Sequence, residues 1–142
     1  MAVDSIEVLI ENFELFDNWE EKYGYLIDLG KQLPPMDDSL KTYENVVKGC
    51  VSKVWLSLSI GKDHEGRRKL SFVADSDAVI VKGLIYILMS AYLDKSVDEV
   101  SAVDINEAFD KLGLSEHLSP NRRNGFFAMV GVIQNAARQA AA

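Results

Sequence analysis

The chain has 142 residues, 48% of them hydrophobic and 26% charged, which are the proportions of an average soluble domain. This length fits one domain, residues 1–142, whose core can form without disulfides or metal. The net charge of −7 argues against nucleic-acid binding, because acidic surfaces repel phosphate. The longest uncharged apolar run, residues 83–93, is too short to span a bilayer, and no signal-peptide pattern is present. We therefore expect a cytoplasmic protein with no membrane association.

Two helices are expected at the start of the chain. Apolar residues recur at helical spacing over residues 6–16, and Asp4 and Glu7 have the spacing of a capping box. A second helix should begin after Asn18 and fade near Gly30.

The hydrophobic period then changes from helical to two. After a loop at 34–45, residues 54–60 alternate between apolar and polar, as in a half-buried strand. A charged turn at 61–66 leads to a return strand at 70–74. Residues 46–47 are expected to add a short third strand.

Helices are expected to fill the rest of the chain. Residues 78–93 are apolar nearly all round, which predicts the most buried helix, and residues 75–77 can cap it. Capping signals then open three further helices: Ser96 with Glu99, Asp104 with Glu107, and Ser119 before Pro120. The last helix should bury an apolar stripe of Phe126, Met129, Val130, Ile133 and Ala137. Helices, strands and helices in this order predict an α+β fold, with a small antiparallel sheet of about three strands and helices packed on one face.

Cys50, the one cysteine of the chain, is the main candidate for chemistry. A free cysteine is often only a small buried hydrophobe, and this reading stays open. Its neighbours also suit a reactive thiol. Lys48 and Lys53 supply positive charge, which stabilises a thiolate, and Gly49 allows a sharp turn and a close approach by a partner.

A single thiol limits the possible reactions. A hydrolase nucleophile needs a base, but nothing in the spacing links His64 or His117 to Cys50, and both histidines suit a surface position. Zinc and iron–sulfur sites generally need three or four ligands. Thiol exchange or sulfur carriage needs only one thiolate, with the second supplied by a partner, and therefore best fits a chain with one cysteine.

Two charged pairs are further candidates. Arg122 and Arg123 lie in the first turn of the expected last helix, where cations oppose the helix dipole. They either bind an anion or a partner, or are simply tolerated there. Asp75 and Asp77 have the spacing of paired carboxylates, although helix capping explains them more simply.

Several blocks of the chain match a known family. They are Lys48-Gly49-Cys50-Val51-Ser52-Lys53-Val54-Trp55, Asp75-Ser76-Asp77-Ala78-Val79-Ile80-Val81-Lys82-Gly83-Leu84, and His117-Leu118-Ser119-Pro120-Asn121-Arg122-Arg123-Asn124-Gly125, supported by residues 18–23 and 29–34. In this order they resemble SufE and its relative CsdE, the sulfur-acceptor partners of cysteine desulfurases. The match spans nearly the whole chain.

The resemblance implies a function and a set of site residues. Cys50 would carry a persulfide, Arg122 would engage the desulfurase, and Asp77 would lie near the acceptor loop and affect its mobility. Lys48, Gly49 and Ser52 flank the acceptor cysteine, although Lys48 is not a fixed feature of the pattern. The implied fold is the SufE/IscU-like α+β fold.

The resemblance also implies partners. They are a SufS- or CsdA-like desulfurase, which brings its own pyridoxal phosphate, and a downstream acceptor such as the SufBCD scaffold. The chain itself would hold no cofactor or metal and would activate the desulfurase without being an enzyme.

Three other functions remain alternatives. An IscU-like cluster scaffold shares the fold, but a lone cysteine argues against it. A single-thiol enzyme such as a peroxidase would act without a partner. A non-reactive adaptor would stimulate the desulfurase without using Cys50.

Overall fold

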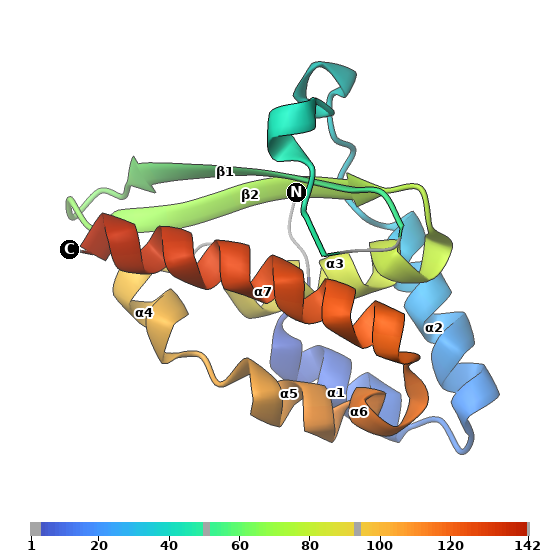
Figure 1. The fold of residues 1–142 in the computed structure, drawn as a ribbon. Coiled ribbons are helices and arrows are strands. Elements are labelled where there is room, and N and C mark those ends of the chain that lie inside the picture. The colour runs from blue at the N-terminus through green and yellow to red at the C-terminus, as the bar shows by residue number, and fades with distance from the viewer. Residues whose placement is uncertain (1–3, 50–51, 93–94, 142) are drawn as a thin grey trace.

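Two antiparallel strands lie over a layer of helices in the computed structural model, which describes residues 4–49, 52–92 and 95–141 (Figure 1). The elements, in chain order, are α1 (Ile6–Glu14), α2 (Trp19–Lys31), the 3₁₀ helices η1 (Asp38–Leu40) and η2 (Tyr43–Asn45), β1 (Val54–Lys62), β2 (Arg68–Ser76), α3 (Val79–Tyr92), α4 (Val97–Ala102), α5 (Ile105–Lys111), α6 (Leu114–His117) and α7 (Pro120–Ala141). This order and layering confirm the α+β class predicted from the sequence.

The sheet separates an apolar face from a solvent-facing one. β1 and β2 pair from Val54 opposite Ser76 to Lys62 opposite Arg68. Side chains of the inner face, including Leu56 and Phe72, are buried against the helices. On the outer face the hydroxyls of Ser59 and Ser71 hydrogen-bond to each other at 2.7 Å. Period-two alternation in the sequence therefore predicted both strands and which of their side chains face the helices.

The prediction of a third strand at residues 46–47 is wrong. Val46 forms only an isolated antiparallel bridge with Trp55. Lys48 and Gly49 turn directly afterwards, and Gly49 has a φ of +91°, so the backbone leaves the extended conformation before a ladder can form.

Side-chain caps set the starts of several helices. The Asn18 side chain accepts a hydrogen bond from the Glu21 amide at 2.9 Å, and Ser96 and Glu99 form a reciprocal capping box. The first helix differs from expectation. Ser5, not Asp4, is its N-cap and accepts from the Val8 amide.

The helix α3 is the centre of the core. Its residues from Gly83 to Met89 are all buried, as its continuous hydrophobicity predicted. It packs against β2, α2, α7 and α1. Because every side of this helix meets protein, a sequence with no polar face is stable there.

The long helix α7 runs beneath the sheet (Figure 1). It buries one stripe, which contains the residues predicted from helical spacing: Phe126, Met129, Val130, Ile133 and Ala137. The short helix α6 before it was not predicted.

No helix among the described residues is long and apolar enough to cross a membrane.

Candidate functional site

The residues on either side of Cys50 form a loop that begins and ends at the sheet. Cys50 and Val51 lie outside the described residues, so the site is built from their neighbours. The Val47 amide donates to the Val54 carbonyl at 2.8 Å and joins the two ends of the loop. We call the described residues 47–49 and 52–53 the acceptor loop.

The acceptor loop lies close to α7. Gly49 is exposed and has a positive φ, and a Cβ atom at this position would lie 3.6 Å from the Cβ of Ala128. The sharp turn that the sequence suggested at Gly49 is therefore present. Lys48 beside it is exposed to solvent.

Two consecutive residues at the β2–α3 junction hold the C-terminal end of the acceptor loop. The buried Ser76 hydroxyl donates to the Lys53 carbonyl at 2.8 Å and accepts from the Ala78 amide at 3.1 Å. The Asp77 carboxylate accepts from the Lys53 amide at 3.1 Å, and the Asp77 amide donates to the Lys53 carbonyl at 3.3 Å. Both backbone groups of Lys53 are thus bound.

Asp75 connects the same junction to two lysines. Its carboxylate lies 3.0 Å from the Lys41 ammonium and 3.6 Å from that of Lys82. Burial acts to raise the pKa of Asp75, but hydrogen bonds from Lys41 and from the Ser76 amide, with the charge of Lys82, outweigh burial and hold this pKa below its usual value. The same ion pair raises the pKa of Lys41.

These contacts correct one expectation. The carboxylates of Asp75 and Asp77 bind lysines and the acceptor loop, whereas the oxygen that accepts from the Ala78 amide at the start of α3 belongs to Ser76. The sequence signal for this arrangement was a serine between two acids at a strand–helix junction, and the capping belongs to the serine rather than to the acids.

Two lysines pack on Trp55 at the base of the acceptor loop. The ammonium groups of Lys41 and Lys53 lie 5.5 and 5.8 Å from the centre of the Trp55 ring, within cation–π range. The Lys41 ammonium is also paired with the carboxylates of Asp38 at 3.3 Å and Asp75 at 3.0 Å, which offset its charge.

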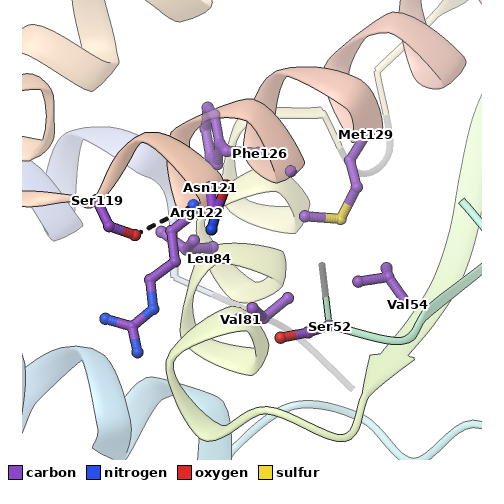
Figure 2. A pocket seen from close by; sticks show the side chains of 10 residues that line it. Ser52, Val54, Val81, Leu84, Ser119, Asn121, Arg122, Phe126 and Met129 are labelled. Carbon is purple, nitrogen blue, oxygen red and sulfur yellow. Dashed lines mark hydrogen bonds between the residues drawn. The ribbon is translucent and has the colours of Figure 1, made fainter. Parts of the chain in front are cut away.

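A pocket of about 360 Å³ lies between the acceptor loop, α3 and the first turns of α7 (Figure 2). Ser52 from the loop and Arg122 from α7 lie on opposite sides of it, as Figure 2 shows. Its remaining lining is mostly apolar: Val54, Val81, Leu84, Gly125, Phe126 and Met129, with Ser119 and Asn121 near Arg122. The pocket thus offers apolar walls and one cation.

The predicted arginine pair separates in the structure. Arg122 is exposed and lines the pocket, and its amide is capped by the Ser119 hydroxyl at 3.3 Å. Arg123 instead donates from Nη1 to the Ser115 carbonyl at 3.3 Å. The sequence identified both arginines but could not say which one faces the pocket.

The two histidines do not line this pocket. His64 lies in the turn between β1 and β2, and His117 ends α6, where its ring stacks on Trp19. Among the described residues, no group of three or more His, Cys, Asp or Glu side chains could hold a metal ion.

Comparison with known proteins places the chain in a family. The model of a family described as "SufE: Fe-S metabolism associated domain" matches residues 7–137. The chain belongs to the SufE family. This SufE chain is therefore associated with Fe–S metabolism.

Relatives and a solved structure agree with the family assignment. An uncharacterized SufE-like protein of Rhizobium etli is 43% identical over 138 residues, covering 97% of this chain and 93% of the relative. One from Rhizobium meliloti is 41% identical over 133 residues, covering 94% of each. The solution structure of a hypothetical protein from Thermus thermophilus superposes with a TM-score of 0.73 at 20% identity, covering 99% of this chain and 98% of that one. At this identity the likeness extends to the fold alone.

Proposed function

We propose that this SufE chain is a sulfur acceptor, which takes sulfur from a cysteine desulfurase onto Cys50 and passes it toward iron–sulfur cluster assembly. One observation supports the proposal above the others. The loop that contains Cys50 in its sequence borders a pocket with apolar walls and Arg122 on its far side. A pocket of this kind suits a sulfur that must be kept from water and yet meet a partner.

The transfer is a thiol–persulfide exchange. The Cys50 thiolate attacks the terminal sulfur of the desulfurase persulfide, a new S–S bond forms, and the S–S bond in the desulfurase breaks. The desulfurase thiolate leaves and Cys50 carries S–SH, a reversible modification. No electrons are gained or lost overall. A thiolate on a downstream scaffold, such as SufBCD, then attacks the terminal sulfur of the Cys50 persulfide, which moves the sulfur to the scaffold and releases the Cys50 thiolate.

The charges near the acceptor loop support each step. Lys53 lies at its base, and Lys48 is two residues before Cys50. They favour the thiolate, which is the attacking species. Removing the desulfurase persulfide regenerates that enzyme, so the chain stimulates turnover without catalysing a reaction by itself. The partner is a SufS- or CsdA-like enzyme that supplies the pyridoxal phosphate.

Mass spectrometry tests this proposal. After incubation with a SufS-like or CsdA-like desulfurase and free cysteine, the intact chain should gain about 32 Da, the mass of one sulfur atom, on Cys50. The Cys50→Ser variant should gain nothing and should not stimulate sulfide release. An unmodified Cys50 beside a desulfurase that turns over would contradict the proposal. Stimulation that survives in Cys50→Ser would instead favour an adaptor.

A further inference from the structure

Trp19, at the start of α2, contacts both ends of the short helix α6. Its indole stacks on the imidazole of His117, the last residue of α6, with ring centres 4.1 Å apart and planes 16° from parallel. A Cβ atom on Gly113, the N-cap of α6, would lie 3.8 Å from Cζ3 of the same indole. One aromatic side chain therefore spans this four-residue helix.

Tyr23, one turn later on α2, holds the backbone of the same segment. Its hydroxyl donates to the His117 carbonyl at 3.2 Å, and its ring packs against Trp19 at 5.2 Å. Trp19 and Tyr23 together thus bind the side chain and the carbonyl of His117. We call these three residues the α2–α6 clamp.

The indole of Trp19 acts in the clamp through packing. Its Nε1 is buried and has no hydrogen-bond partner in the described part of the chain. A buried donor without a partner is unfavourable, so the contacts of the ring must outweigh this penalty for Trp19 to stay in place. A helix as short as α6 does not hold its conformation alone and depends on such tertiary contacts.

The clamp lies directly before the part of α7 that lines the pocket. Two residues after His117, Ser119 caps the Arg122 amide, and the Arg123 side chain donates back to the Ser115 carbonyl in α6. Ser119, Asn121 and Arg122 form one wall of the pocket. A displacement of α6 would therefore move Arg122 relative to the acceptor loop.

We infer that Trp19, Tyr23 and His117 are positioning residues, which fix Arg122 and its wall of the pocket for docking of the desulfurase. The inference rests on the proposed function. It assigns a role in sulfur transfer to the first turns of α2, which do not line the pocket. Because the clamp acts on docking, its loss should weaken association with the desulfurase and leave the exchange at Cys50 unchanged.

Titrating the chain into a SufS-like desulfurase with excess cysteine, while measuring sulfide release, separates docking from chemistry. His117→Ala removes the stacked ring and should raise the half-saturating concentration about tenfold, a loss of about 1.4 kcal/mol in binding. The rate at saturation should stay at the wild-type value. His117→Phe keeps a flat ring on Trp19 and should recover most of the loss.

Two tyrosines of α2 provide a matched pair. Tyr23→Phe removes the hydrogen bond to His117, whereas Tyr25→Phe removes a hydrogen bond of 2.8 Å from Asn12 in α1. Each variant loses one hydroxyl from the same helix. Only Tyr23→Phe should raise the half-saturating concentration, by about threefold, the effect of losing one ordinary hydrogen bond. This pair decides the question even if His117→Ala does not fold.

The outcomes distinguish a failure of this inference from a failure of the proposed function. If the wild-type chain neither gains sulfur nor stimulates the desulfurase, the proposed function fails. If it does both, but Tyr23→Phe and Tyr25→Phe shift the titration equally or not at all, the positioning role is overturned. Loading of Cys50 from a small polysulfide needs no docking, and it should proceed at the wild-type rate in every variant.

Discussion

Three consecutive side chains at the β2–α3 junction each hold a different part of the molecule. Asp75 binds Lys41 and Lys82, Ser76 binds the Lys53 carbonyl, and Asp77 binds the Lys53 amide. Lys41, which precedes the acceptor loop, and Lys53, which ends it, are thus held by consecutive residues at the end of β2. A change at this junction should therefore affect both segments at once.

Asp75 should make the stability of the protein depend on pH. Its folded-state pKa is lowered from the ordinary value of 3.8, so its contribution is present above that value and is lost as the pH falls toward the folded-state pKa. We expect Asp75→Asn to lower the free energy of unfolding by about 1 kcal/mol at neutral pH. Urea unfolding at several pH values measures this difference, which should shrink as the pH falls below 3.8.

A double-mutant cycle identifies the partner that is responsible. Lys41→Met removes the nearer ammonium. The stability losses of Lys41→Met and Asp75→Asn should be non-additive, with an interaction energy of about 0.5–1 kcal/mol at neutral pH. Equal losses for Asp75→Asn at neutral and acidic pH would contradict an ionic role for this carboxylate.

Two glycines allow α2 and α3 to pack unusually closely. A Cβ atom on Gly83 would overlap the Leu26 carbonyl oxygen, and one on Gly30 would lie 2.9 Å from the Lys82 Cβ. The backbones of the two helices therefore meet with no side chain between them. This contact lies beside the junction that holds the acceptor loop, so the position of α3 matters for the site.

Replacing a glycine by alanine should have opposite effects on stability in the two helices. Gly83→Ala forces the helices apart and should lower the free energy of unfolding by about 1–3 kcal/mol. Gly24→Ala in α2 is the matched control, because nothing lies within 4 Å of its added Cβ. This control should raise stability by about 0.5–1 kcal/mol, the usual gain for glycine to alanine in a helix. Chemical denaturation of both variants measures the difference, and a loss of stability in both would contradict the packing argument.

At the scale of the whole molecule, α7 connects distant parts of the structure. Its first turns line the pocket, the helix packs against α4, α3 and β1, and Arg68 of β2 donates to the Ala140 carbonyl near its end. The core residues form one continuous cluster drawn from nearly every element. We therefore propose that the chain unfolds as a single unit.

The two tryptophans can test this cooperativity, because one begins α2 and the other lies in β1. In the single-tryptophan variants Trp19→Phe and Trp55→Phe, the fluorescence of the remaining indole reports on one region. Within each variant the fluorescence and far-UV circular dichroism transitions should coincide, as expected for two-state unfolding of a small domain. Two separate transitions in either variant would instead show that the helices and the sheet unfold independently.

Most elements of this protein could be predicted from sequence, because their signals are local. Helical spacing identified the buried stripe of α7, period two identified β1 and β2, and the side chains of Asn18 and Ser96 marked helix starts. The motif blocks identified the family, and with it Cys50 as the candidate acceptor.

The contacts between distant residues could not be predicted in the same way. The pocket combines the acceptor loop, α3 and α7, and the α2–α6 clamp joins residues 94 positions apart, from Tyr23 to His117. Asp75 and Asp77 carry local signals that fit a helix cap. Asp77 instead meets the Lys53 backbone beside the pairing of Val54 with Ser76, and Lys41 reaches Asp75 from the segment before β1. Local patterns fix backbone conformation, whereas contacts between distant segments depend on how the whole core packs, which no short stretch of sequence encodes.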